Sequence, residues 1–400
     1  MPVKLRAQDD LKTLMAAYYL ESKNASFNNK KVAWVSSGAP VEFLYALGYI
    51  PIYPENYAAM CGAAKMSPAL IGEAEAAGYV SDLCSYARTD IGADIAQGGP
   101  VMGLPHPDLI VAGTNICTTI IKWFQQIAYR KKVPFVALEM PYLTAGFGRD
   151  EVDFLVAQFK RFRDVAAEVA GVPFDEDRFM EVVKLSAEGS ALWGQVLDTA
   201  RQRPAPLSAL DAFIHIAPIV TLRGTATPIE YYKTLLSELE EITRGGMVTD
   251  AQRVRLMWDN LPIWFRLRRM SEFLAFRGAI VVASTYTNSW AAIKEMPRKL
   301  DDIYAALARA YLEPYINRNF LDRVAILSAM AEEFEVDGMI MHSNRSCKPY
   351  SIGQYMLKDM FTKATGKPVL ILDADMNDPR AYSDEQAEGR IDAFLEGIAK

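Results

Sequence analysis

The chain has 400 residues, of which 51% are hydrophobic and 23% charged, a composition typical of globular α/β proteins with large cores. Its formal net charge of -6 and pI near 5.4 argue against a protein that binds nucleic acid or an anionic membrane, because both need a concentrated basic surface. The charged N-terminal segment lacks the apolar core of a secretory signal, and no apolar run approaches the roughly 20 residues of a membrane span. We therefore expect a cytoplasmic protein without a membrane segment.

The first 150 residues alternate between short apolar segments and amphipathic ones. The expected strands are KVAWVSS (31–37), IPIYP (50–54), DLIVAGT (108–114) and PFVALEM (134–140). Apolar residues at helical spacing predict helices at 40–48, over 67–97 and over 118–130. Alternation of this kind predicts a parallel sheet covered by helices.

The rest of the chain is first helical and then alternating again. From about 150 to 250 the pattern is almost wholly helical, with a break at the proline-containing RQRPAPLSA (201–209). Later strands are expected at GAIVVAST (278–285), DGMIMHS (337–343) and KPVLILDAD (367–375), and helices over 300–334, 349–364 and 384–398. The pattern predicts two α/β domains at 1–150 and 251–400, joined by a mainly helical domain at 151–250.

The two alternating regions resemble each other. EFLYALGYIPIYP begins at Glu42 and EFLAFRGAIVVAS at Glu272, an offset of 230 positions that Trp34 and Trp264 share. PDLIVAGTNIC (107–117) parallels VDGMIMHSNRSC (336–347) at nearly the same offset. A shared offset over separated segments indicates that the two α/β domains are related to each other.

Four cysteines, Cys61, Cys84, Cys117 and Cys347, are spread too widely for a disulfide framework in a reducing compartment. Cys117 and Cys347 occupy equivalent places in the two repeats, each between a strand and a helix. Cys84 lies early in a predicted helix whose N-cap we expect at Ser81 or Asp82. Thiols at helix starts have a lowered pKa and favour a thiolate. Buried cysteines with no such role are the alternative.

Metal chemistry is open to these residues in more than one form. Structural zinc sites use closely spaced Cys or His pairs, which this chain lacks. His106, His215 and His342 are the available imidazoles, and we interpret His106 and His342 as structural hydrogen-bonding residues. Iron–sulfur clusters accept three thiolates and can leave one iron open, but spacing alone does not establish one.

Five motifs carry a family resemblance: YPENYAA (53–59), DLCSYARTDIG (82–92), PDLIVAGTNICTTIIKW (107–123), HSNRSCKPYSIGQY (342–355) and DADMNDPRAY (373–382). Over essentially its whole length the chain resembles the larger, cluster-bearing subunit of the 2-hydroxyacyl-CoA dehydratase and benzoyl-CoA reductase family. The resemblance implies a 4Fe-4S cluster held by Cys84, Cys117 and Cys347, with the fourth iron position open. Cys61 falls outside the ligand pattern, and we expect it to be a structural thiol.

The same resemblance implies that Ser37, in VSSGAP, and Glu55, in YPEN, line the pocket for an acyl-CoA substrate. We expect Glu55 to transfer protons and Ser37 to hydrogen-bond the substrate or an iron-bound water. From the residues alone, Ser37 follows a strand and opens a helix, and Glu55 follows another strand. A helix cap and a solvated carboxylate are the alternatives for these two residues.

The implied reaction removes water from a 2-hydroxyacyl-CoA and gives an enoyl-CoA. One low-potential electron converts the thioester to a ketyl radical anion, which expels the 2-hydroxyl, acidifies the β-proton and finally returns the electron. The first alternative is a subunit of an ATP-dependent benzoyl-CoA reductase, to which RGTATPIEYY (223–232) and VVASTYT (281–287) are similar. A second alternative is a cluster protein for electron transfer or storage, in which Cys61 would close the cluster.

The resemblance also implies partners: a homologous second subunit that completes a heterodimer, an ATP-dependent iron–sulfur activator, and ferredoxin or flavodoxin as electron donor. The chain contains no G-x-x-x-x-G-K-[ST] motif, so ATP hydrolysis is expected on another protein. The basic RLRR (266–269), with Arg253 and Arg255, could contact coenzyme A phosphates or a partner protein. A solvated helix face is the alternative that we favour for it.

Overall fold

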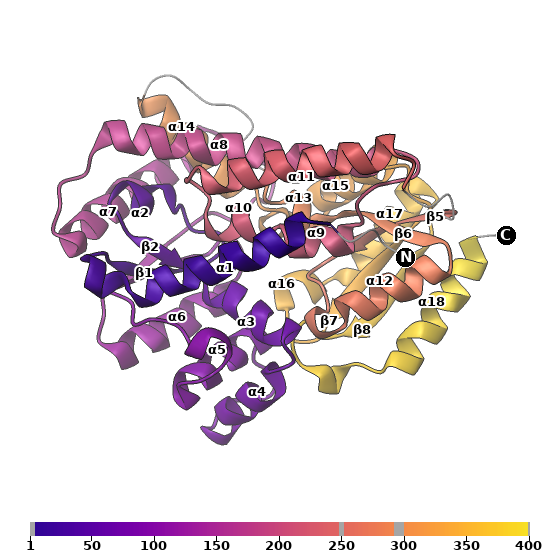
Figure 1. Cartoon of the computed structure of the whole chain (residues 1–400), viewed down its shortest axis with the longest axis horizontal. Helices are drawn as coiled ribbons and strands as arrows, with labels where there is room; N and C mark the ends of the chain where they lie inside the picture. Colours follow the sequence, from indigo (N-terminus) through magenta and orange to yellow (C-terminus); the bar gives the residue numbers. More distant parts are fainter. Residues whose placement is uncertain (1–4, 248–251, 292–299, 399–400) are drawn as a thin grey trace.

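Two four-stranded parallel sheets form the framework of the protein in a computed structural model that describes residues 5–247, 252–291 and 300–398 (Figure 1). The first sheet has the strand order β2-β1-β3-β4 and the second β6-β5-β7-β8. The strands are β1 (Val32–Val35), β2 (Ile50–Ile52), β3 (Leu109–Gly113), β4 (Phe135–Leu138), β5 (Val254–Asp259), β6 (Ala279–Ser284), β7 (Gly338–Asn344) and β8 (Val369–Ala374). The expected fold class, with two parallel-sheet α/β units, is confirmed.

Helices cover both faces of the first sheet, so its central strands are buried along their whole length. Val32 pairs with Ile50 on one side of β1, and Ala33 pairs with Leu109 on the other. The helices in this part of the chain are α1 (Ala7–Lys23), α2 (Glu42–Ala46), α3 (Pro54–Ala63), α4 (Ser67–Ala76), α5 (Ser85–Ala96) and α6 (Thr118–Lys131). Continuous burial explains why these strands read as unbroken apolar runs.

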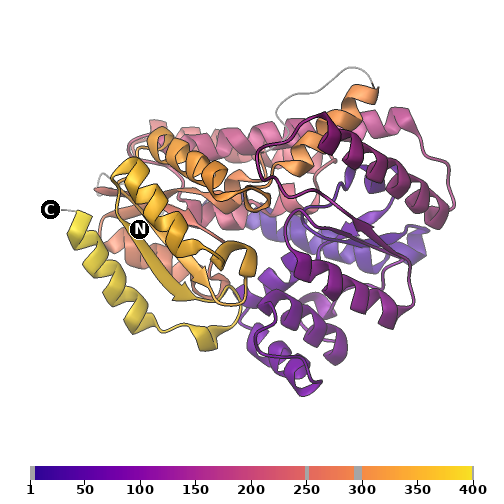
Figure 2. The ribbon, with the colours of Figure 1, turned by 180° about the vertical axis from the view of Figure 1, so that it is seen from behind.

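Three long helices and two short ones follow the first sheet. They are α7 (Arg149–Ala170), α8 (Glu176–Asp198), α9 (Ala209–His215), α10 (Ala217–Thr221) and α11 (Thr227–Arg244), with the expected break between α8 and α9. Figures 1 and 2 show α8 and α11 side by side along one edge of the molecule, reaching across both sheet units. The later helix α14 (Leu300–Leu312) packs back on this region, where Tyr304 joins the rings of Phe43 and Phe179. The boundaries expected at residues 150 and 250 stay a prediction.

The second sheet contains a strand that the sequence pattern did not predict. This strand, β5, lies in the middle of the sheet and carries the buried Arg255. The Arg255 guanidinium donates to the carbonyls of Phe334 and Ala200 at 2.8–3.0 Å, which compensates for its burial. The helices around this sheet are α12 (Leu267–Phe276), α13 (Thr285–Asn288), α15 (Phe320–Glu333), α16 (Lys348–Ser351), α17 (Gln354–Thr365) and α18 (Asp384–Ile398).

The internal repeat is visible in the topology, because both sheets place their four strands in the same order. Figure 2 shows the two units next to each other from behind. The aligned segments fall on equivalent elements, α2–β2 with α12–β6, and β3 with β7. The tryptophan match was wrong: Trp34 lies in β1, whereas Trp264 lies in a 3-10 turn after β5. Trp258, in β5, is also buried, but it packs in the same cluster as α12, whereas Trp34 packs in a different cluster from α2, the helix equivalent to α12.

Candidate functional site

A cavity lies where the carboxyl ends of the two sheets face each other, the usual position of ligands in open α/β sheets. It measures about 180 Å³, many times the roughly 10–15 Å³ that one water needs, so it has room for a bound group. Five residues expected at the site line this cavity together: Ser37, Glu55, Cys84, Cys117 and Cys347. Segments far apart in the sequence therefore converge on one place.

The three cavity cysteines each occupy the N-cap position of a helix, α5 for Cys84, α6 for Cys117 and α16 for Cys347. Each is partly exposed. Cys117 Sγ accepts a hydrogen bond from the backbone N–H of Thr119 at 3.3 Å. The N-cap of α5 is Cys84 itself, so the expectation of Ser81 or Asp82 was wrong.

Burial dominates the acidity of two of these thiols. It raises the pKa of Cys84 to about 12, although a backbone hydrogen bond from Ala87 lowers it. Burial also raises the pKa of Cys347 well above its ordinary value, and the neighbouring Cys84 and Cys117 add to that rise. The lowered thiol pKa expected at helix starts is therefore wrong for Cys84 and Cys347. The influence of Cys84 and Cys117 on Cys347 places these thiols close together.

The fourth cysteine and the histidines lie elsewhere. Cys61 is fully buried in the core on α3, where burial raises its pKa to about 12, and it does not line the cavity. His342 is buried, and its Nδ1 lies 2.6 Å from the carbonyl oxygen of Leu261. His215 Nδ1 lies 2.5 Å from the hydroxyl of Tyr231. These contacts agree with structural roles for both imidazoles.

Glu55 and Ser37 form a pair on the wall of the cavity. The backbone N–H of Ser37 donates to Glu55 Oε2 at 2.6 Å. Burial raises the pKa of Glu55 to about 7, although hydrogen bonds from the Ser37 backbone and side chain oppose the rise. Glu55 lies in the first turn of α3, directly after β2, as expected. Ser37 lies in a turn ahead of Val41, the N-cap of α2, so the expectation that it opens a helix was wrong.

Aromatic side chains also contribute to the cavity wall: Tyr86, Trp123, Tyr286, Trp290, Tyr311, Tyr315 and Tyr350. Such a lining excludes water and suits an apolar ligand. Sequence reasoning did not assign these residues to the site, although Tyr86 and Tyr286 lie within the quoted DLCSYARTDIG and VVASTYT. An aromatic residue in an apolar segment carries no signal that separates a pocket wall from a core.

One buried ion pair also reaches the cavity and was missed. Arg223 lines it, and its Nε lies 3.3 Å from Glu42 Oε1. Tyr311 donates to Glu42 Oε2 at 2.7 Å and accepts from Arg223 at 2.9 Å. The pair therefore has its charges and lone pairs compensated inside the protein, as buried ions require. RGTATPIEYY begins with Arg223 but does not reveal that the side chain points inward.

The basic residues around 253–269 do not form a patch. Arg255 is buried in β5, so its assignment to a basic surface was wrong. Arg266 and Arg269 pair with Asp384, and Arg268 pairs with Glu272 four residues along α12. Arg268 is 91% exposed, which confirms a solvated, ion-paired helix face.

The donor set of the cavity indicates what metal group it could hold. Within residues 5–247, 252–291 and 300–398, no group of three or more His, Cys, Asp or Glu side chains could hold a single metal ion. Three thiols from both sheet units nevertheless face one cavity, whereas the imidazoles of His215 and His342 lie outside its lining. A set of three thiolates fits an iron–sulfur cluster. Such a cluster contains several irons and is therefore larger than a single metal ion.

The family that the motifs indicate is also the one that a comparison with known protein families finds. Residues 36–398 match the family model for the 2-hydroxyglutaryl-CoA dehydratase D-component. The chain belongs to this family. A chain in this dehydratase-component family is thus built from two related α/β units whose facing ends enclose the cysteines.

Individual relatives cover nearly the whole of this family member. It is 31% identical to the (R)-2-hydroxyisocaproyl-CoA dehydratase alpha subunit of Clostridioides difficile, over 99% of this chain and 97% of the relative. It is 30% identical to the (R)-phenyllactyl-CoA dehydratase alpha subunit of Clostridium sporogenes, over 98% and 95%. It is also 33% identical to a benzoyl-CoA reductase subunit of Thauera aromatica, over 89% and 86%. Relatives from both branches of the resemblance are therefore similar to this chain.

Within the described residues, no helix combines the length and apolarity that crossing a membrane requires.

Proposed function

We propose that the chain is the iron–sulfur subunit of a 2-hydroxyacyl-CoA dehydratase, which converts a 2-hydroxyacyl-CoA to an enoyl-CoA. The observation that carries the proposal is the convergence of Cys84, Cys117 and Cys347 with Ser37 and Glu55 on one cavity, in a chain of the dehydratase-component family. We place the protein in the cytoplasm, as its sequence predicts.

Cys84, Cys117 and Cys347 would hold a 4Fe-4S cluster and leave its fourth iron without a protein thiolate. The chemistry that such a cluster supplies when bound is one-electron transfer at low potential, here to the thioester carbonyl to give a ketyl radical anion. Cys61 lies in the core of α3 and away from the cavity, so it does not complete a four-thiolate cluster. That placement argues against a closed cluster for electron transfer or storage alone.

Glu55 is suited to proton transfer in this cavity. A pKa of about 7 allows the carboxyl group both to accept and to release a proton near neutral pH. We propose that a carboxylate oxygen of Glu55 accepts the proton that leaves the β-carbon of the substrate. The hydrogen bond from the Ser37 backbone fixes the carboxylate, and the Ser37 hydroxyl is available to a substrate oxygen.

The aromatic wall serves the acyl group. Trp123, Tyr286 and Trp290 present apolar surface on the cavity wall, which suits an apolar acyl group. Two cationic residues, Arg223 and Lys348, also line the cavity, and the charge of Arg223 is compensated by Glu42. We therefore expect acyl groups with an apolar remainder to be preferred over those with a second carboxylate.

Partners complete the system. The alpha-subunit names of the relatives support a second, homologous subunit and hence a heterodimer. We propose an ATP-dependent iron–sulfur activator that donates the electron, itself reduced by ferredoxin or flavodoxin. The chain has no Walker-type loop of its own for ATP hydrolysis.

A benzoyl-CoA reductase subunit is the second candidate, which the identity of 33% to a subunit of that enzyme favours. The two activities differ in electron use, because a dehydratase recycles its electron, whereas a reductase consumes ATP and reductant at every turnover. The deciding experiment incubates the reconstituted, activated complex with a panel of 2-hydroxyacyl-CoA thioesters and with benzoyl-CoA while ATP consumption is followed. We expect dehydration with far less than one ATP per product. Reduction of benzoyl-CoA with ATP use proportional to product, and no dehydration, would overturn the choice.

A further inference from the structure

We propose that Ser346 and the segment Asp375–Arg380 form a clasp between the two sheet units that sets the separation of Cys84 and Cys347. This inference rests on the proposed function in one respect, since it treats these cysteines as cluster ligands. It assigns a role to the polar residues of DADMNDPRAY (373–382), a motif from which Met376 lines the cavity. The clasp consists of Ser346 and residues 375–380.

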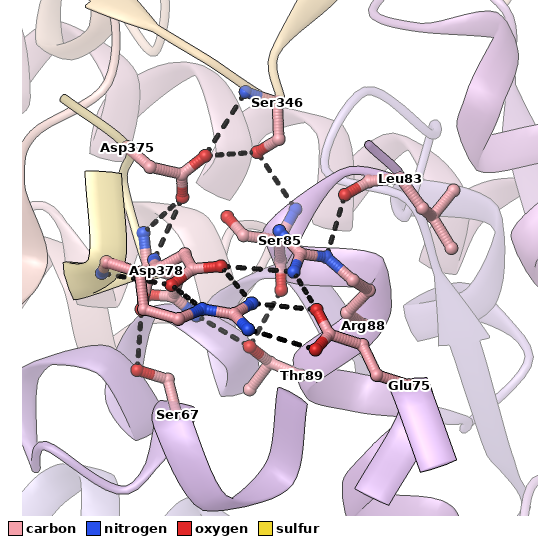
Figure 3. Close-up of polar contacts among 11 residues, drawn as sticks. Ser67, Glu75, Leu83, Ser85, Arg88, Thr89, Ser346, Asp375 and Asp378 are labelled. Carbon is pink, nitrogen blue, oxygen red and sulfur yellow. Dashed lines mark hydrogen bonds and ion pairs between the residues drawn. The ribbon is translucent and has the colours of Figure 1, made fainter. Parts of the chain in front are cut away.

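Ser346 directly precedes Cys347, the N-cap of α16, and it contacts Ser85 at the start of α5, as Figure 3 shows. Its hydroxyl oxygen accepts a hydrogen bond from the backbone N–H of Ser85 at 3.0 Å. Ser85 is the first residue of α5, where backbone N–H groups have no partner inside the helix. Ser346 therefore caps α5 from the opposite sheet unit. The two capping partners are sequence neighbours of Cys347 and Cys84.

Asp375 holds Ser346 in the orientation that this cap needs. Asp375 Oδ2 accepts from the hydroxyl of Ser346 at 2.5 Å and from its backbone N–H at 3.2 Å. The other oxygen, Oδ1, accepts from the backbone N–H groups of Asn377 and Asp378, both at 2.9 Å. The hydroxyl proton points to the carboxylate, which leaves a lone pair of Ser346 Oγ for Ser85. Asp375 is buried, and its four donors make its position rigid.

The rest of the segment ties this arrangement to the helices of the first unit. Asn377 Nδ2 donates to the carbonyl of Ala58 in α3 at 2.8 Å and to Thr89 Oγ1 in α5 at 3.1 Å. The hydroxyl of Ser67, at the start of α4, donates to the carbonyl of Asn377 at 2.7 Å. A Cβ added at Gly62 in α3 would lie 2.0 Å from Asn377 Oδ1, so glycine is what permits this approach.

Charged contacts close the outer side of the clasp. Arg88, in α5 and 2% exposed, donates to Asp378 at 3.1 Å and to Glu75 at 2.6 Å. Arg380 donates to the same two carboxylates at 2.6–3.0 Å. The helix that begins at Cys84 is thus attached along its first turn to the segment that positions Cys347. Both residues at the centre of the clasp, Ser346 and Asp375, are positioning residues.

The test uses the full-length protein, purified anaerobically, as wild type, Ser346→Ala, Asp375→Asn and the double variant. Ser208→Ala is the matched control, because Ser208 caps α9 away from the cysteines. Two quantities are measured: hydrogen–deuterium exchange of the peptide covering 80–96, and the rate at which an iron chelator removes iron. We expect both to rise roughly fivefold to tenfold in Ser346→Ala, the effect of losing one ordinary helix cap.

The double variant should be no faster than the faster single variant, because both substitutions break the same contact. Ser208→Ala should leave both quantities at the wild-type values. Unchanged exchange in Ser346→Ala would refute the clasp, and faster exchange with unchanged iron release would refute its link to the cysteines. A wild-type protein that binds no iron would instead contradict the proposed function, and the exchange measurement would still decide whether the clasp exists.

Discussion

At the scale of single residues, the cavity is defined by side chains whose ordinary behaviour burial has changed. Burial raises the pKa of the Glu55 carboxyl group to about 7 and that of the Cys84 thiol to about 12. Perturbed groups of this kind cluster at functional sites more often than elsewhere. Cys61 shows the contrast, because its thiol is equally perturbed but faces a core. Position on the cavity wall, rather than a shifted pKa alone, separates the two.

The ligand assignment leads to the first prediction. Single Cys→Ser variants at positions 84, 117 and 347 should lose most of their iron, because each removes one of only three thiolates. Cys61→Ser should keep its iron and lose only some stability, since it places a hydroxyl in the core. Iron is quantified in anaerobically purified protein. Full iron retention in Cys117→Ser or Cys347→Ser would show the assignment to be wrong.

The second prediction concerns Glu55 and pH. Its folded-state pKa of about 7 lies above its ordinary value of 4.5, so the folded chain binds more protons than the unfolded chain between these values. The Glu55 contribution to the free energy of unfolding is therefore present below about pH 4.5 and is lost as the pH rises to about 7. Glu55→Gln lacks this loss, so as the pH rises to about 7 and above, the variant should become more stable relative to wild type by up to about 3 kcal/mol.

The measurement is denaturant unfolding of both proteins across pH 4.5 to 8. A stability difference between them that does not change with pH would contradict the raised pKa. The variant should also lose most of its turnover in the activated complex, because an amide cannot take up the β-proton.

At the scale of elements, helix packing decides where Cys84 lies. Helices α4 and α5 approach so closely at Gly92 that a Cβ there would lie 1.7 Å from the carbonyl oxygen of Leu70. That contact is with backbone, which cannot rotate away as a side chain can. The start of α5, and with it Cys84, is thus positioned by a glycine two turns further along the helix.

This close approach yields the third prediction. Gly92→Ala should destabilise the protein by about 1–3 kcal/mol, because the added methyl forces α4 and α5 apart. Gly72→Ala, at an exposed position of α4 with open space at its Cβ, should instead gain about 0.5–1 kcal/mol from helix propensity. Thermal unfolding of the two variants provides the comparison. Equal effects of the two substitutions would mean that the helices are not in contact at Gly92.

At the scale of the whole molecule, the site is shared between two sheet units that arise from one repeated topology. Cys84 and Cys117 come from the first unit and Cys347 from the second. A bound cluster would therefore link the units covalently, and its loss should lower thermal stability. Under the proposed function, nucleotide hydrolysis and the electron source belong to other proteins.

The fourth prediction follows from that division of labour. The purified chain alone should show no turnover with any 2-hydroxyacyl-CoA, because it has no nucleotide-binding loop to drive an electron to low potential. Addition of the second subunit, the activator, ATP and a strong reductant together should restore activity, and omission of each in turn serves as the control. Turnover by this polypeptide without ATP would contradict the assignment.

Three features could be predicted from the sequence: the α/β class, the internal repeat, and the placement of three cysteines at helix starts. These features depend on local periodicity and on strand ends, which a buried parallel sheet imposes on its own segments. Strand β5 escaped prediction because Arg255 interrupts its apolar run, and only carbonyls from distant segments make that burial possible. The family motifs supplied Ser37 and Glu55, for which periodicity alone favoured a cap and a solvated carboxylate.

Which side chains line the cavity, and which contacts join the two sheet units, could be seen only in the folded chain. Arg223 meets Glu42 from 181 positions away, and Ser346 caps a helix that begins 261 positions earlier. Contacts between residues so far apart in the sequence produce no periodic pattern. Each of these side chains is polar and could equally have faced solvent. Burial and the need to pair every buried polar group select these partners, and both conditions exist only once the two sheets have come together.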